Sequence, residues 1–230
     1  MKFSVIVATW NEGSQIGSAL KRLRHISQQS PMEIIVVDGH SDDQTVEEAK
    51  PWADQVIVLD EPNRGRQFDE GARKATGDLL LFLRADAQPP GNWQQALEHF
   101  WLMPHPHKVA ATVFTIDYGV SLPFRVASFL SNASARWRGR AGGDHGLCTT
   151  PEIYKESGGF PPFHYMDDFA LCDRLGKLGD LVVLKERIWP AARRMHRRGV
   201  LRSAVYHLWL DLRYKLGASP EALWRSYYNL

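Results

Sequence analysis

Three carboxylates in the first half of the chain stand where apolar runs end. Glu12, Asp38 and Asp86 each follow a separate run of this kind, and Arg84 adds a guanidinium two residues before the last of them. An ionised carboxylate accepts hydrogen bonds from a base or a ribose, and it also binds divalent cations. If only one such residue were present, the simpler interpretation would be that its carboxylate accepts hydrogen bonds within the loop that follows it. Three at one edge of a sheet favour a binding site.

The elements that would bring these residues together alternate between strand and helix. Apolar runs predict buried strands, and segments with apolar residues at the helical period predict helices between them. This alternation is typical of an α/β protein with a mostly parallel central sheet flanked by helices, in which the strand ends meet at one edge. The predicted strands are 3–8, 33–37, 56–59 and 79–83, and the predicted helices, caps included, are 14–23, 41–49, 67–75 and 92–101.

The run from Leu79 to Leu83 is predicted to lie in the middle of this sheet. Five consecutive apolar residues bounded by polar ones are typical of a strand that is buried on both faces. Pro89 and Pro90 are expected to prevent further strand pairing. Arg84 and Asp86 then lie just past the carboxyl end of the strand, which is the edge where open α/β sheets bind ligands.

The second half has a less regular pattern. We expect a single domain with a nucleotide-binding half at 1–100, an acceptor-side half at 101–200 and C-terminal helices at 201–230. The elements expected after residue 101 are a strand at 109–116, a helix at 122–137, a mobile glycine-rich loop at 139–146, a helix from 151, a helix at 167–178, a short strand at 181–184 and two last helices.

Composition limits the class of protein. The 230 residues are 44% hydrophobic, and the net charge of +2 gives no indication of a nucleic-acid partner. Cys148 and Cys172 lack metal-ligand spacing, so they predict neither a zinc site nor a disulfide scaffold. The first residues are too weakly apolar for a signal peptide and no run reaches transmembrane length, so we expect a cytoplasmic protein.

The chain lacks the Walker, Rossmann and hydrolase motifs, but a series of other motifs resembles family 2 glycosyltransferases of GT-A fold. The resemblance covers nearly the whole chain in order, and it extends to a bacterial subgroup often found beside radical-SAM and selenium-associated genes. The matching segments are 4–12, 35–43, 65–67, 71–72, 81–86, 143–147, 158–161, 166–168 and 192–194.

The resemblance implies transfer of a sugar from a nucleoside diphosphate donor to a hydroxyl of a lipid or small molecule, with inversion at the anomeric carbon. It implies that Asp38 faces the nucleoside base and that the loop of Thr9, Asn11 and Glu12 lines the same pocket. Paired guanidinium groups suit a diphosphate leaving group. The other donor contacts that we expect are Arg66, Gln67, Arg84, Ala85, Asp86, Arg193 and Arg194.

The resemblance also implies a divalent cation, Mg²⁺ or Mn²⁺, at the family's D-x-D motif. Asp86 matches the last carboxylate of that motif, but Arg84 stands where the first would be. One carboxylate binds Mg²⁺ weakly, although Mg²⁺ normally takes only one or two together with phosphate oxygens. We therefore expect weaker metal dependence than in D-x-D enzymes, with Arg84 either neutralising the diphosphate or pairing with Asp86.

The pair Asp167 and Asp168 matches the family's carboxylates near the acceptor, where the general base lies. Adjacent helical residues point about 100° apart, and we assign Asp168 as the base and Asp167 as a positioning residue. The alternative is an ordinary N-cap role. Asp144 and His145 are expected in an acceptor loop, and His196 is a further candidate.

Two other functions are weighed against transfer. A nucleotidyltransferase of related fold needs a glycine-rich basic loop after the first strand, where this chain has residues 8–11, Ala-Thr-Trp-Asn. A non-catalytic GT-A-like scaffold is favoured by the altered D-x-D motif and opposed by the presence of Asp38, Asp168 and the arginine pair. A basic cluster is either a solvated face or a peripheral contact with an anionic membrane, and it comprises Arg187, Arg197, Arg198 and Arg202.

Overall fold

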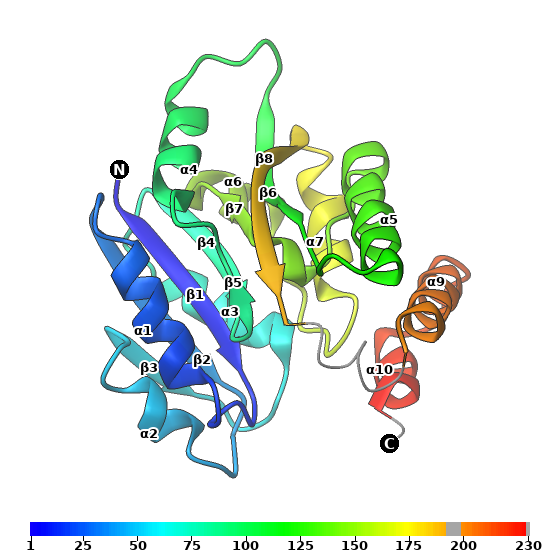
Figure 1. Ribbon diagram of the computed structural model, residues 1–230, viewed down its shortest axis with the longest axis horizontal. Helices are drawn as coiled ribbons and strands as arrows, with labels where there is room; N and C mark the ends of the chain where they lie inside the picture. Colours follow the sequence, from blue (N-terminus) through cyan, green and yellow to red (C-terminus); the bar gives the residue numbers. More distant parts are fainter. Residues whose placement is uncertain (192–198, 229–230) are drawn as a thin grey trace.

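The computed structural model describes residues 1–191 and 199–228 of the chain. Within this part, the strands form one sheet in the order β3-β2-β1-β4-β7-β6-β8-β5 (Figure 1). The predicted α/β architecture is thus confirmed. The strands are β1 (Phe3–Thr9), β2 (Met32–Asp38), β3 (Gln55–Val58), β4 (Leu79–Arg84), β5 (Ala87–Gln88), β6 (Val109–Ile116), β7 (Leu147–Thr149) and β8 (Asp180–Pro190).

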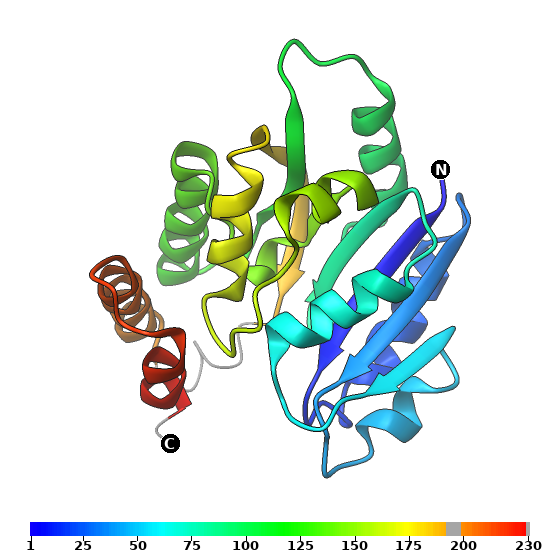
Figure 2. The same ribbon diagram turned by 180° about the vertical axis from the view of Figure 1, so that it is seen from behind.

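Helices cover both faces of this sheet. α1 and α4 lie on the face turned to the viewer in Figure 1, and α3, α6 and α7 lie on the face turned to the viewer in Figure 2. Among the described residues the helices are α1 (Ile16–Ile26), α2 (Thr45–Ala49), α3 (Arg64–Lys74), α4 (Trp93–Leu102), α5 (Leu122–Arg138), α6 (Pro151–Ser157), α7 (Asp167–Leu175), α9 (Val200–Lys215) and α10 (Pro220–Tyr228).

β4 is central because both of its faces are apolar. Leu79, Leu81 and Leu83 pack into the core beneath α1 and α4, whereas Leu80 and Phe82 pack into the core beneath α3, α6 and α7. All five side chains are buried. β4 pairs in parallel with β1, and its Arg84 is in register with Ala8. The prediction of a strand buried on both faces is therefore confirmed, and Arg84 stands at its carboxyl end.

The glycine-rich segment 139–146 differs from the sequence prediction. It was expected to be a mobile loop, but it contains a 3-10 turn, Gly143–His145, and both Ala141 and His145 are buried. It leads into β7, an unpredicted strand that pairs antiparallel with both β4 and β6. β7 has three residues, which is too short for a strand period to be visible in the sequence.

Two further boundaries differ from the prediction. The strand expected at 181–184 continues to Pro190, because buried and exposed side chains alternate through its charged second half. Just before Pro89 the chain forms β5, which pairs antiparallel with the end of β8. Asp86 therefore lies in a tight turn between β4 and β5, close to the end of β8.

The last two helices pack on the segment that precedes α7. Leu210 of α9 and Leu223 of α10 form a small core with Tyr165 and Met166. The rings of Tyr165 and Tyr227 are stacked, with 4.7 Å between their centroids. Among the helices in the described part of the chain, none has both the length and the apolar character that a membrane span requires.

Candidate active site

Asp38 lies at the carboxyl edge of the sheet and is fully buried. It is in register with Thr9 on the neighbouring strand, and its Oδ1 accepts hydrogen bonds from the Thr9 hydroxyl at 3.0 Å and the Ser41 hydroxyl at 2.6 Å. Its Oδ2 accepts from the Ser41 backbone N–H at 2.8 Å. The carboxylate thus joins the ends of β1 and β2, and three donors of the protein itself surround it.

Asn11 and Glu12 form the loop that follows β1. Asn11 adopts a left-handed conformation, with φ of 54°. Its N–H donates to the Ser41 hydroxyl at 2.8 Å, and its side-chain Oδ1 accepts from the N–H of Asp42. The Glu12 N–H donates to the Thr45 hydroxyl at 2.8 Å. These bonds fix the two loops after β1 and β2 against each other.

Arg66 and Gln67 lie side by side at the start of α3, but they point to different environments. Gln67 is buried, and its amide nitrogen donates to the carbonyl of Thr9 at 2.7 Å and to that of Val37 at 2.8 Å. Arg66 is at the surface, where it pairs with Asp60 and Glu61. Gln67 therefore links the ends of β1 and β2 through its amide group, whereas Arg66 takes no part in this link.

Arg84 is the centre of a charged cluster past the end of β4. Its Nε lies 3.1 Å from Asp144 Oδ1 and 3.4 Å from Asp86 Oδ1. The Tyr118 hydroxyl donates to Asp144 Oδ2 at 3.1 Å. The structure thus brings Asp144 to the same place as Arg84 and Asp86. Tyr118 belongs to the cluster too, although sequence analysis did not select it.

The cluster keeps its charges through mutual support. The carboxylate of Asp144 raises the pKa of Arg84 further above its ordinary value. Burial alone would raise the pKa of Asp144, but Arg84 and the Tyr118 hydroxyl outweigh burial and hold it below its usual range. Burial, together with Asp144, raises the pKa of Tyr118. At neutral pH the cluster therefore contains a permanent guanidinium beside an ionised carboxylate.

A close contact between α3 and the segment before α7 positions the acidic pair. The Asn63 side chain caps α3 by accepting from the Arg66 N–H at 3.0 Å, and its amide donates to the Pro162 carbonyl. A Cβ on Gly65 would lie 1.9 Å from the Pro161 carbonyl oxygen, so only glycine allows this approach. The contact brings Arg64 to the start of α7.

Arg64 binds both members of the acidic pair. Its Nε lies 3.0 Å from each carboxylate oxygen of Asp167, and its Nη2 lies 3.3 Å from Asp168 Oδ2. Burial raises the pKa of Asp167, and the guanidinium opposes this rise. Asp167 is fully buried, so we infer that its role is to fix the start of α7 to Arg64. Arg64 was not selected from the sequence because its partner lies 103 residues away.

Asp168 has a different environment from its neighbour. Met166 occupies the N-cap position of α7, so neither aspartate is the N-cap residue. Within the first turn, Asp168 Oδ1 accepts from the Phe169 N–H at 2.8 Å. Asp168 Oδ2 accepts from the Gly143 N–H at 2.7 Å, and the side chain remains partly exposed. The positive end of the helix dipole favours negative charge at this position. Of the pair, Asp168 is the carboxylate that a ligand can reach.

Gly143 connects Asp168 with the Arg84 cluster. A Cβ built on Gly143 would lie 3.6 Å from Asp168 Oδ2 and 3.8 Å from Arg84 Cδ. The base candidate and the aliphatic part of the Arg84 side chain therefore both lie beside one glycine. Three distant parts of the chain therefore meet here. They are the end of β4, the 139–146 segment and the start of α7.

His145 is placed in the core rather than beside the cluster. Its Nδ1 lies 2.9 Å from the Phe114 carbonyl oxygen, and its Nε2 lies 3.0 Å from the Ser131 hydroxyl. A carbonyl only accepts, so Nδ1 carries the proton and Nε2 accepts from Ser131. Burial lowers the pKa of His145. The neutral ring thus connects β6 with α5 through its two hydrogen bonds.

This neutral histidine predicts a loss of stability in mild acid. The unfolded chain binds a proton near pH 6.5, whereas folded His145 does not. The unfolding free energy should therefore fall as pH decreases from 7.5 to 5.5, by at most about 1.4 kcal/mol per pH unit. Urea unfolding at both pH values measures this, and His145→Gln should show a smaller difference. An equal difference in both proteins would contradict the assignment.

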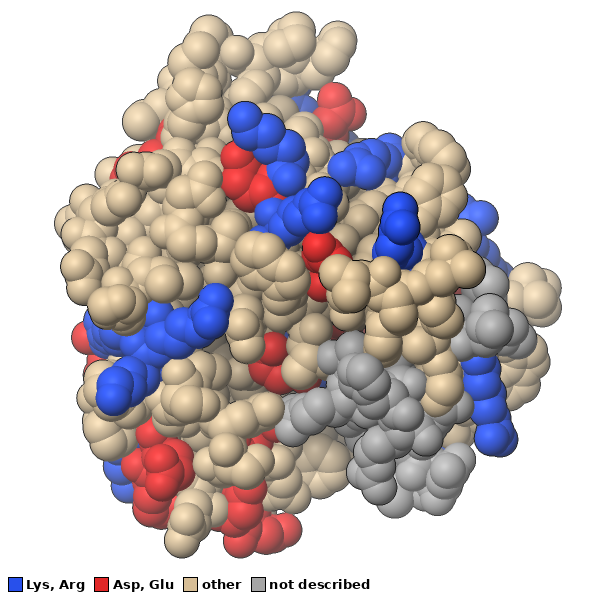
Figure 3. All heavy atoms as spheres, in the orientation of Figure 1, with Lys and Arg blue, Asp and Glu red and all other residues tan. Residues whose placement is uncertain are grey.

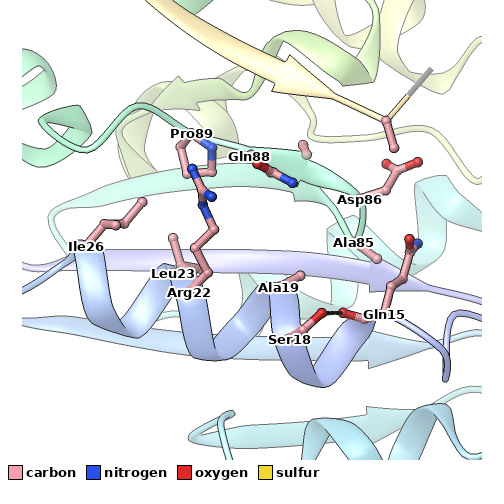
Figure 4. Close-up of a pocket in the computed structure, with 12 residues that line it drawn as sticks. Gln15, Ser18, Ala19, Arg22, Leu23, Ile26, Ala85, Asp86, Gln88 and Pro89 are labelled. Carbon is pink, nitrogen blue, oxygen red and sulfur yellow. Dashed lines mark hydrogen bonds between the residues drawn. The ribbon is translucent and has the colours of Figure 1, made fainter.

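A hollow of about 240 Å³ lies on the other side of Asp86, between α1 and the turn after β4. Asp86 and Gln15 stand at one end, and Arg22 approaches Gln88 and Pro89 at the other (Figure 4). Ala85 contributes to its wall. The expected donor residue Ala85 thus faces α1. Arg193, Arg194 and His196 lie outside the described residues.

The arrangement of sheet and helices is that of the GT-A fold. A mannosyltransferase from Pyrobaculum calidifontis, solved with GDP-Man and Mn²⁺, superimposes with a TM-score of 0.64 at 23% identity, covering 83% of this chain and 56% of that one. Glucosyl-3-phosphoglycerate synthase from Mycobacterium tuberculosis, solved with Mn²⁺, UDP and glucosyl-3-phosphoglycerate, gives 0.64 at 18% identity, covering 90% and 78%. The predicted fold class is confirmed.

The chain belongs to glycosyl transferase family 2, because the model of that family matches residues 4–157. A dolichol-phosphate mannosyltransferase from Pyrococcus furiosus is 32% identical over 95 residues, which is 39% of this chain. The chain spans 27% of the length of that relative.

Proposed function

We propose that this protein transfers a sugar from a nucleoside diphosphate donor to a hydroxyl group of a lipid or small molecule in the cytoplasm, with inversion at the anomeric carbon. The observation that carries the proposal is the position of Asp168. Its partly exposed carboxylate accepts from the Gly143 N–H at 2.7 Å, and the Arg84 side chain lies beside the same glycine. A proton acceptor and a side chain that carries a cation for the leaving group are therefore close together.

In the proposed reaction, the acceptor oxygen forms a bond to the anomeric carbon as the bond from that carbon to the donor phosphate oxygen breaks. Asp168 takes the acceptor's proton. The electron pair of the broken bond leaves with the nucleoside diphosphate, whose charge Arg84 balances together with Arg193 and Arg194. Asp167, held by Arg64, keeps the start of α7 in place.

The donor is proposed to lie along the carboxyl edge of the first three strands in the sheet order. The loop of Thr9, Asn11 and Glu12 would line the base and ribose pocket, and Asp38 would shape it through Ser41. The nucleotides in the two solved structures support a nucleoside diphosphate donor.

We also propose that the chain belongs to the radical-SAM and selenium-associated subgroup. The motifs that support this proposal are at 143–147, 166–168 and 192–194.

The described residues do not fit a divalent cation held as a D-x-D motif holds it. Arg84 occupies the position of the first carboxylate, and its Nε lies 3.4 Å from the remaining one, Asp86. A metal ion on Asp86 would thus meet a guanidinium. In the part of the chain that the structure describes, no three His, Cys, Asp or Glu side chains come together as metal ligands do. Arg84 is the cation that the chain itself supplies at this position.

Transfer activity should therefore survive EDTA. Arg84→Ala should lower kcat by about 10- to 100-fold, since a hydrogen bond to a charged group contributes about 1.5–3 kcal/mol. Arg73→Ala is the matched control, because Arg73 is an exposed arginine on α3 that pairs with Asp69 at 2.8 Å. Complete loss of activity in EDTA with full recovery on adding Mn²⁺ would contradict this role of Arg84.

The experiment that tests the function is a two-stage assay on the purified chain. UDP-, GDP- and dTDP-sugars are first screened by thermal shift, since a ligand that binds only the folded state raises its apparent stability. The best donor is then used to detect transfer to candidate hydroxyl acceptors and release of the nucleoside diphosphate. A donor that binds but is neither transferred nor hydrolysed would favour the scaffold alternative.

A further inference from the structure

The helix α5 exposes an apolar stripe along its whole length. Leu122 is 73% exposed, Phe129 63% and Trp137 79%, and Val126 and Leu130 are exposed between them. At 100° per residue these five side chains fall within about 100° of the helix circumference. We call them the α5 stripe. The side chains that α5 buries against the protein lie on its other side and are Ala127, Asn132 and Ala135.

The stripe is continuous rather than a set of scattered residues. The rings of Phe129 and Trp137 are in edge contact, with 6.5 Å between their centroids. The stripe is extended at its start by Val120, which is 95% exposed in the loop before the helix. Single exposed apolar residues are ordinary, but a contiguous row of large ones indicates an interaction surface.

The charged residues of α5 and of the loops on either side of it are all basic. Residues 118–143 contain four arginines and no lysine, aspartate or glutamate. Arg125 and Arg136 follow one border of the stripe, whereas Arg138 and Arg140 pair with Asp211 of α9, at 3.9 and 3.5 Å. In Figure 3, basic side chains lie among uncharged ones over α5, whereas a dense group of acidic ones lies at the lower left, over α2. The surface is therefore apolar, with a cationic border formed by Arg125 and Arg136.

An apolar stripe with a cationic border favours one kind of partner for α5 over another. A second copy docked by two-fold symmetry would bring two cationic borders into one interface, since such an interface repeats one patch on both subunits. An anionic bilayer instead accepts aromatic and aliphatic side chains at the boundary of headgroups and acyl chains, while arginines meet lipid phosphates. Trp and Phe are typical of that interface.

The stripe is also tied to the charged cluster. Two residues before Val120, Tyr118 bonds Asp144 through its hydroxyl and Ser128 of α5 through its N–H. Ser131 of α5 bonds His145, the residue after Asp144. A surface that holds α5 therefore holds the flank of the Arg84 cluster at a short distance.

We propose that the α5 stripe docks the protein on an anionic lipid bilayer, with the five apolar side chains inserted and the bordering arginines on lipid phosphates. The proposal does not depend on the transfer reaction. It also differs from the membrane contact considered for the basic cluster of residues 187–202, of which Arg187 pairs with Asp117 at 3.0 Å.

The test is sedimentation of the full chain with vesicles, without donor or acceptor. Binding is expected to vesicles of phosphatidylcholine with one third phosphatidylglycerol, to weaken in high salt, and to be much lower with phosphatidylcholine alone. Phe129→Ser with Trp137→Ser should lower the bound fraction at least tenfold. The matched control is Leu102→Ser with Met103→Ser, an exposed apolar pair at the end of α4, which should bind like the unaltered chain.

Three outcomes would overturn the proposal. The first is no sedimentation with either vesicle, and the second is an equal loss in the α4 control. The third is a dimer in light scattering that the Phe129 and Trp137 changes dissociate, which would assign the stripe to a second copy. Donor binding measured by thermal shift on the same variants should be unchanged, so a negative vesicle result leaves the proposed function separately testable.

Discussion

Replacing Asp168 with asparagine is expected to lower kcat by about 10²–10⁴-fold, because a positioned general base contributes a factor of that size. The amide keeps the shape of the side chain and can still accept the hydrogen bond from the Gly143 N–H. It cannot take a proton from the acceptor. Donor affinity should therefore stay close to that of the unaltered chain, and the melting temperature should fall only modestly, because the bond from the Phe169 N–H to Oδ1 is lost.

The matched control for Asp168 lies on the same helix. Asp173 pairs with Arg140 at 2.8 Å on the outer side of α7, and Asp173→Asn should leave kcat unchanged. Single-turnover measurements would separate the chemical step from product release. If Asp168→Asn mainly lowers the melting temperature and spares kcat, the base must be sought elsewhere, and Asp144 is then the next candidate because Asp167 is enclosed by Arg64.

Replacing Arg64 with leucine is expected to cost about 3–5 kcal/mol of unfolding free energy, the usual result of leaving one member of a buried ion pair alone. Asp167 is fully buried and Arg64 holds both of its carboxylate oxygens. The same change also removes a contact of Asp168. Urea unfolding measures the loss, and kcat should fall in the fraction that remains folded.

Two companion variants make this prediction specific. Arg66→Leu, two residues along α3, removes ion pairs that lie at the surface, and it should cost less than about 1 kcal/mol. Arg64→Leu combined with Asp167→Asn should recover part of the stability, since the fully buried carboxylate of Asp167 is then no longer left charged without its partner. Equal losses for the two arginine variants would contradict the role given to Arg64.

The sequence predicts the first half of the fold well because its elements are long and locally determined. The apolar run of β4 requires burial on both faces, and the structure provides two cores for it. β7 and β5 could not be predicted, since strands of three and two residues show no period and depend on partners far along the chain. The charged second half of β8 hid an alternation of exposed and buried side chains.

The positions of the carboxylates in the candidate site could be predicted from the sequence, but the residues that bind them could not. Glu12, Asp38, Asp86 and Asp168 stand at strand or helix ends, which local patterns locate. Arg64 and Tyr118 join the site only through contacts with residues far along the chain. The Arg-Gly-Arg sequence at 64–66 was a signal for the first of them, but Arg66 was selected and Arg64 was not.

The antiparallel insertion of β7 has a consequence for how the chain can fold. Until residues 147–149 arrive, β4 has a partner only on its β1 side, and its other edge offers unpaired backbone groups along an almost wholly apolar strand. Such an edge is a template for intermolecular pairing. A fragment ending near residue 100 should therefore aggregate on the ribosome or in the test tube, and a chaperone that shields this edge would have to act until the 3-10 turn and β7 have emerged.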